Sequence, residues 1–77
     1  MKYFVEIDQK LKAIFTFNNF LEALDFINQI ADISVQLEHY PEIQLQNGKD
    51  LTITTPDSPV SPKDKQLSQQ IEDLMDD

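Results

Sequence analysis

The chain has 77 residues, a net charge of −8 and no cysteine, which indicates one small domain, residues 1–77, without disulfides or thiolate nucleophiles. All six basic residues are lysines. Without arginine the chain cannot form bidentate hydrogen bonds to phosphate, so direct nucleic-acid binding is not favoured. Glu6 interrupts the first apolar run and no stretch is as long as a membrane span, so we expect a cytoplasmic protein with no membrane partner.

The first seventeen residues predict a β-hairpin. Lys2 to Ile7 and Leu11 to Phe17 are predicted strands, and Asp8-Gln9 is a plausible short turn between them. The turn lacks the glycine of the strongest hairpin signals. The second strand turns one face to the predicted core, with Ala13, Phe15 and Phe17 on it.

Residues 19–35 predict a long amphipathic helix. Asn19 is a typical N-cap, and Glu22 three residues later completes a capping-box pattern. Its apolar face is broad enough to cover a sheet and to contact a partner. Four aromatic residues from the second strand and this helix are expected in the core: Phe15, Phe17, Phe20 and Phe26.

Residues 42–55 predict a second hairpin. Glu42 to Gln46 and Leu51 to Thr55 flank Asn47-Gly48, and Asn-Gly is the strongest short turn signal because both residues tolerate positive φ. Gly48 is the only glycine in the chain, which suggests a position where other residues do poorly.

Residues 62–75 predict the last helix. Ser61 is a suitable cap, Pro62 suits the first helical position, and Asp64 follows in the first turn. The acidic end at Asp76 and Asp77 opposes the helix dipole, so we expect fraying there. The predicted class is α+β, with order β-β-α-β-β-α: a four-stranded antiparallel sheet with two helices packed on one face.

His39 is the only histidine, and it lies in Glu38-His39-Tyr40-Pro41-Glu42. Histidine is the side chain best suited to proton transfer near neutral pH, so this run is the first candidate for a site. A surface or capping role for His39 remains open. One histidine among scattered acids gives little reason to expect a metal, and no metal or cofactor is predicted.

Three motifs resemble the pterin-4a-carbinolamine dehydratase family, also called 4a-hydroxytetrahydrobiopterin dehydratase. The resemblance covers about Ala13 to Leu74. Its motifs are Phe15-x-Phe17-x-x-Phe20-x-x-Ala23-x-x-Phe26 followed by Ile30-Ala31, then Glu38 to Glu42, then Val60-Ser61-Pro62-Lys63-Asp64. In the family, two adjacent histidines precede the proline, and an aspartate ends the last motif.

The resemblance implies a function as well as a fold. Members of the family dehydrate the 4a-carbinolamine of a tetrahydropterin to quinonoid dihydropterin, without a metal, as dimers or tetramers. Other members act as dimerisation cofactors of a transcription factor or as assembly chaperones. Carried over to this chain, the catalytic residues are His39, Tyr40 and Asp64. The expected substrate contacts are Glu38, Pro41, Glu42 and Thr55.

This chain departs from the family pattern at the histidines, so it resembles a divergent member. Tyr40 stands in place of the second histidine, and Ile43 in place of an aromatic. The third histidine falls on Thr55 when the chain is aligned from the helix side, or on Pro56 when aligned by strand parity. Tyrosine, with a pKa near ~10, can donate a proton but is a poor base at pH 7. Glu38, Glu42 or Asp57 could replace the missing base.

Three hypotheses follow. The first is a divergent dehydratase whose turnover is weak and depends on His39. The second is a non-catalytic homodimer or homotetramer that binds a pterin or holds a protein partner. In that case, charges placed on the last helix at Leu67 or Ile71 matter more than loss of His39. The third is an unrelated domain of the same element order. Asp64 is a catalytic residue in the first hypothesis. The alternative is that it only stabilises the start of the last helix.

Overall fold

The computed structural model describes residues 1–76, which form four strands and two helices in the predicted order. The elements are β1 (Val5–Ile7), β2 (Lys10–Thr16), α1 (Phe20–Leu37), β3 (Glu42–Gln46), β4 (Asp50–Thr54) and α2 (Pro62–Met75). No helix in this range is long and apolar enough to cross a membrane. The predicted fraying of Asp77 lies outside the described residues.

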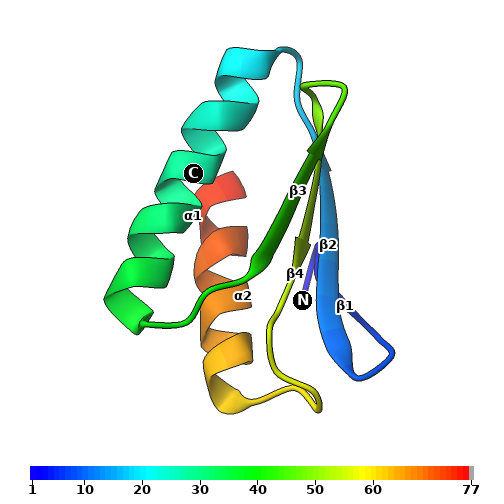
Figure 1. The fold of residues 1–77 in the computed structure, drawn as a ribbon, viewed down its shortest axis with the longest axis vertical. Coiled ribbons are helices and arrows are strands. Elements are labelled where there is room, and N and C mark those ends of the chain that lie inside the picture. Colours follow the sequence, from blue (N-terminus) through cyan, green and yellow to red (C-terminus); the bar gives the residue numbers. More distant parts are fainter. Residues whose placement is uncertain (77) are drawn as a thin grey trace.

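The strands form one antiparallel sheet in the order β1-β2-β4-β3, and both helices cover the same face (Figure 1). The predicted fold class is therefore confirmed. β4 lies in the middle and pairs with β2 and β3, with Ile53 opposite both Ala13 and Ile43. The α1–β3 connection and the loop before α2 approach each other at one end of the two-layer structure.

β1 is shorter than predicted, because residues 2–4 use their backbone differently. The N–H groups of Lys2, Tyr3 and Phe4 donate to the carboxylate of Glu72 on α2, at 3.0, 2.6 and 2.8 Å. These amides therefore do not pair with β2. The contact joins residues about seventy positions apart, and it left no signal in the local pattern.

Both hairpin turns form as predicted. Asp8 and Gln9 take positive φ values of 53° and 67°, so the first turn closes without glycine. Asn47 and Gly48 take 55° and 68°, and the N–H of Lys49 donates to the carbonyl of Gln46 at 3.1 Å. The two-residue turns have the positive φ values that match the twist of the paired strands.

The core lies between the sheet and the helices. Phe15 and Phe26 are buried as predicted, and Phe17 is half-buried against them. Phe20, however, is 54% exposed, so its predicted core position was wrong. It covers the second turn instead: a Cβ added at Gly48 would lie 3.2 Å from Cδ1 of Phe20.

The helix starts match their sequence signals to different degrees. Asn19 accepts from the N–H of Glu22 at 2.9 Å, which is the first half of the predicted capping box. At α2 both halves form, between Ser61 and Asp64. α1 runs two residues beyond the predicted end, to Leu37, because Glu38 terminates it in the left-handed region at φ 52°.

Candidate active site

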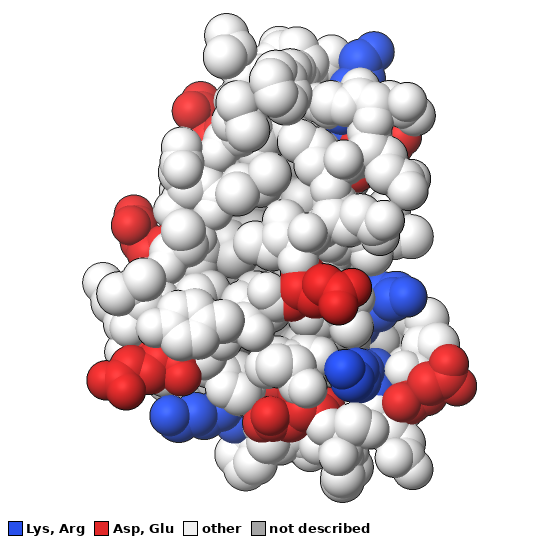
Figure 2. All heavy atoms as spheres, in the orientation of Figure 1, with Lys and Arg blue, Asp and Glu red and all other residues white. Residues whose placement is uncertain are grey.

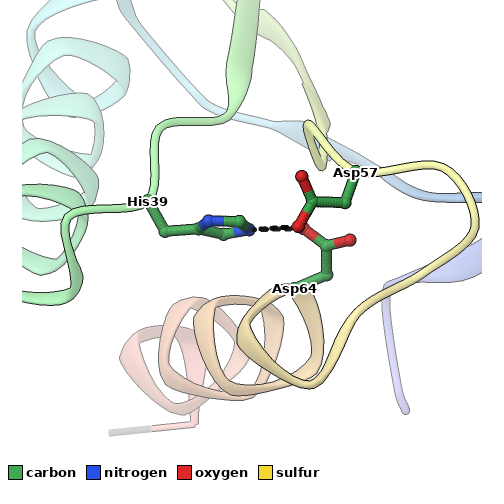
Figure 3. A group of neighbouring side chains, drawn as sticks. All are labelled: His39, Asp57 and Asp64. Atoms are coloured by element: carbon green, nitrogen blue, oxygen red, sulfur yellow. Dashed lines mark hydrogen bonds and ion pairs between the residues drawn. The ribbon is translucent and has the colours of Figure 1, made fainter.

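The end of α1 determines where His39 lies. Glu38 takes the left-handed conformation, and the N–H of His39 donates to the carbonyl of Ser34 at 3.0 Å. This hydrogen bond belongs to the reversing turn that commonly ends helices. The chain therefore leaves α1 with the imidazole of His39 directed toward the start of α2 (Figure 3).

The start of α2 holds Asp64 in a fixed position. Its N–H donates to Oγ of Ser61 at 3.2 Å, and its own Oδ2 accepts from the N–H of Ser61 at 3.0 Å. Asp64 is fully buried. A buried carboxylate is strongly destabilising unless it is hydrogen-bonded, and this reciprocal arrangement satisfies one of its oxygens.

The other oxygen of Asp64 contacts the histidine. Nε2 of His39 lies 2.6 Å from Oδ1 of Asp64, and the side chain of His39 is only 11% exposed. Since Asp64 accepts at both oxygens, we assign the Nε2 proton to the imidazole, which leaves Nδ1 as an acceptor in the neutral ring. An aspartate bonded to one ring nitrogen fixes both the orientation and the tautomer of a histidine.

A second carboxylate faces the same ring nitrogen. Oδ2 of Asp57, in the loop before α2, lies 3.6 Å from Nε2 of His39 and accepts from Oγ of Ser61 at 2.7 Å. Figure 3 shows both carboxylates beside the imidazole, coming from two different segments. The sequence indicated Asp57 as a possible base. No local pattern of residues predicted that Asp57 lies close to Asp64.

The three side chains are also the natural candidates for a metal site. Donor atoms of His39, Asp57 and Asp64 all lie within 4.8 Å of one another. A tetrahedral zinc ion holds nitrogen and oxygen ligands about 2.1 Å from itself and therefore roughly 3.4 Å apart. The 2.6 Å between Nε2 and Oδ1 is instead the length of a direct, charge-assisted hydrogen bond. The geometry thus fits proton transfer better than metal binding.

The remaining predicted residues lie around this pair without joining it. Tyr40 is 61% exposed, and Pro41 is half-buried. Glu38 is exposed at the end of α1. Glu42 pairs with Thr54, whose neighbour Ile53 faces the core, so Glu42 points to the sheet face away from the helices.

Thr55 belongs to the sheet end rather than to the site. It is 1% exposed, and its Oγ1 accepts from the N–H of Leu11 at 2.9 Å. Its own N–H donates to the carbonyl of Leu11 at 2.9 Å, which extends the ladder by one residue, while Pro56 is exposed. The expected contact between Thr55 and a substrate therefore has no support from this geometry.

A family model for pterin 4 alpha carbinolamine dehydratase matches residues 3–74, nearly the whole chain. This chain belongs to that family. A protein of Prochlorococcus marinus named "Putative pterin-4-alpha-carbinolamine dehydratase" is 33% identical over 90% of this chain and 76% of its own length. A relative with the same name from Picosynechococcus is also 33% identical, over 69% of this chain and 59% of its own length. The match to a third, from Marinobacter nauticus, is 40% identical and spans only 38% of that relative.

Solved structures of the family share the fold. A transcriptional coactivator/pterin dehydratase from Brucella melitensis superposes with a TM-score of 0.80, at 20% identity, over 91% of this chain and 77% of its own. A pterin dehydratase-like protein described as a RuBisCO assembly factor in the alpha-carboxysome gives 0.77 at 15% identity, over 92% and 84%. At these identities the likeness concerns the fold. The family-model match over residues 3–74 sets aside the third hypothesis, an unrelated domain.

Proposed function

We propose that this chain is a 4a-hydroxytetrahydrobiopterin dehydratase, a hydro-lyase that converts the 4a-carbinolamine of a tetrahydropterin to quinonoid dihydropterin. His39 is its principal acid–base group. The observation that carries the proposal is the 2.6 Å contact between Nε2 of His39 and the buried carboxylate of Asp64. It orients the one remaining family histidine at the position of the family motif.

The reaction requires two proton movements. The hydroxyl on C4a leaves as water when it receives a proton, and the proton on N5 must pass to a base as the C4a–N5 double bond forms. With Nε2 bonded to Asp64, Nδ1 of His39 is the ring atom that exchanges protons with the substrate. Asp64 is a positioning residue here, because it acts through the imidazole and is itself fully buried.

Tyr40 is proposed as an accessory donor. It occupies the position of the second family histidine, next to His39, and it is 61% exposed. A phenol is a usable donor to a leaving hydroxyl but a poor base at neutral pH. Glu38, Pro41 and Glu42 flank this pair and are proposed only as outer substrate contacts.

The expected rate is low for the family. Each positioned acid–base group contributes about 10²–10⁴ to a rate, and two of the three family imidazoles are replaced in this chain. Since such contributions are not additive, the deficit is smaller than the product of the two factors. Slow turnover above the uncatalysed background is the expected result.

A second candidate is a non-catalytic role as a homodimer or homotetramer that holds a protein partner. The observation that favours it lies on α1, where Phe20, Leu21 and Val35 are 54%, 73% and 63% exposed. Phe20 and Leu21 lie in the first turn of α1 and Val35 lies in its last, about 21 Å away along the helix, so each end exposes apolar surface that a partner could cover. Figure 2 shows the lysines of the viewed face interspersed with carboxylates, which fits a protein partner better than a nucleic acid.

The test is a dehydration assay with freshly generated 4a-hydroxytetrahydropterin, comparing the wild type with His39→Ala and His39→Gln. The dehydratase proposal expects wild-type turnover above background, and a loss of about 10²-fold in both variants. A folded wild type at background rate excludes it and supports the partner-holding role. Sedimentation of the same samples measures the oligomeric state.

A further inference from the structure

The three side chains of the site differ sharply in how accessible they are. The side chain of Asp64 is 0% exposed and that of His39 is 11% exposed, whereas that of Asp57 is 47% exposed. Donor atoms of all three lie within 4.8 Å of one another, and of the two carboxylates only that of Asp57 is open to solvent. Accessibility therefore separates the two carboxylates, although both face the same atom.

Their hydrogen bonds separate them further. Asp64 uses one oxygen for His39 and the other for the N–H of Ser61, so both oxygens are occupied. Within residues 1–76, Asp57 makes both of its polar contacts through Oδ2, which lies 2.7 Å from Oγ of Ser61 and 3.6 Å from Nε2 of His39. Asp57 thus keeps Oδ1 for a further proton, and Asp64 does not.

We propose that Asp57 is the second acid–base group of this site and compensates for a missing histidine. The inference rests on the proposed function. The N5–H proton passes to the carboxylate of Asp57, and the N–H electron pair forms the C4a–N5 double bond. The C4a–O bond breaks as Nδ1–H of protonated His39 donates to the hydroxyl, which leaves as water. Solvent then takes the proton from Asp57 and returns one to His39, so protons and electrons balance.

The position of Asp57 in the chain fits this role. It lies one or two residues after the position matched to the third family histidine, which is Pro56 or Thr55, and Thr55 is buried in the sheet ladder. The loop that leaves the ladder brings the carboxylate of Asp57 within 3.6 Å of Nε2 of His39. Three carboxylates could replace the missing base, and among the described residues Asp57 is the one of these that lies near the imidazole of His39. Glu38, at the end of α1, and Glu42, at the start of β3, are exposed to solvent.

The decisive variant is Asp57→Asn, which keeps the size of the side chain and an acceptor for Ser61. Asp25→Asn is the matched control, because it removes one charge from an exposed position on α1. Turnover is measured at pH 7 for the wild type, both variants and Asp57→Glu, with unfolding curves of each. The titratable groups that face Asp57 are His39 and Asp64, and both are unchanged in all four proteins.

The expected result has three parts. Asp57→Asn loses turnover by about 10²-fold, because an amide cannot accept the N5 proton. Asp57→Glu restores part of the turnover, and Asp25→Asn behaves as the wild type. All four proteins unfold at similar denaturant concentrations.

Two outcomes overturn the inference, and they are distinguishable. If the wild type turns over and Asp57→Asn retains its rate, Asp57 is not the base while the dehydratase proposal stands. If the wild type itself shows no turnover, the proposed function fails and the role of Asp57 fails with it.

Discussion

Two buried carboxylates on the same helix serve different purposes. Asp64, near the start of α2, bonds the imidazole of His39, while Glu72, in its last turns, accepts the backbone N–H groups of Lys2, Tyr3 and Phe4. Both are almost fully buried, at 0% and 3% exposed. Burial of an acid therefore does not by itself mark a functional site. The partners differ: Asp64 bonds a titratable side chain, which in the proposed function carries the chemistry, whereas Glu72 bonds backbone amides and holds the N-terminal segment.

Removing the carboxylate of Glu72, which holds the N-terminal segment, has the largest expected effect on stability. Glu72→Ala leaves three backbone donors without their acceptor, which costs about 3 kcal/mol, since hydrogen bonds to charged groups are the stronger ones. Urea unfolding measures it, with Asp73→Ala, at an exposed neighbouring position, as the control. If both variants lose equally little, Glu72 does not hold the N-terminal segment.

Asp64→Asn is expected to cost less stability, about 1–2 kcal/mol, because the single oxygen of asparagine accepts either from His39 or from Ser61 and its NH2 group faces the other partner. The same substitution should also change which ring nitrogen of His39 carries the proton. In the wild type, ¹⁵N spectra of the neutral ring should show the proton on Nε2, and in Asp64→Asn a mixture of tautomers. Glu72→Ala should leave the ring spectrum unchanged. The same tautomer mixture in the wild type contradicts the assigned hydrogen bond.

The contribution of Glu72 to stability should depend on pH. Burial acts to raise the pKa of Glu72, but the N–H groups of Phe4, Lys2 and Tyr3 outweigh it, so its pKa lies below the ordinary value. A carboxyl whose pKa is lower in the folded state stabilises the fold above its unfolded pKa, about 4.3. This stabilisation is lost as the pH falls through the folded pKa. Unfolding free energies measured from pH 6 to pH 2 should therefore fall more steeply below about pH 4.3 in the wild type than in Glu72→Gln.

A smaller effect is expected away from both carboxylates, at the second turn. Gly48→Ala places a side chain at φ 68°, 3.2 Å from the ring of Phe20, and should cost about 1 kcal/mol. Gly48→Asn should cost less, because asparagine tolerates this conformation. Turnover per folded molecule should not change in either variant. A loss of activity here would mean that the site depends on distant parts of the sheet.

The smallest expected effect is that of Tyr40→Phe. Its hydroxyl is on an exposed side chain, so stability should change by less than about 0.5 kcal/mol. Turnover should fall by less than about tenfold, because water can replace an exposed donor. A loss as large as that of His39→Ala would make Tyr40 a principal catalyst rather than an accessory one.

The sequence predicted most of the fold because its signals are local. Turn residues Asn47 and Gly48, the cap at Ser61 and the alternation in β2 each depend on neighbours a few positions away, and each formed. Phe20 was misplaced because helical spacing alone does not say which apolar residues meet the sheet. It lies at the first turn of α1, beyond the layer of Phe15 and Phe26.

The site could be predicted only in part. The motif around His39 and the helix start at Asp64 carried local signals, and the structure brings these two together. The nearness of Asp57, the attachment of Glu72 and the engagement of Thr55 with Leu11 are contacts between distant segments. Such contacts depend on how the loops and helix ends pack, which no local pattern of residues records.

The most direct test of this account compares dehydration turnover, per folded molecule, in Asp64→Asn and Glu72→Gln. The two variants make the same chemical change at opposite ends of α2. We expect Asp64→Asn to lose at least about tenfold in turnover because His39 is no longer held in one tautomer, and Glu72→Gln to match the wild type. Equal turnover in the two variants would contradict the claim that Asp64 acts through His39.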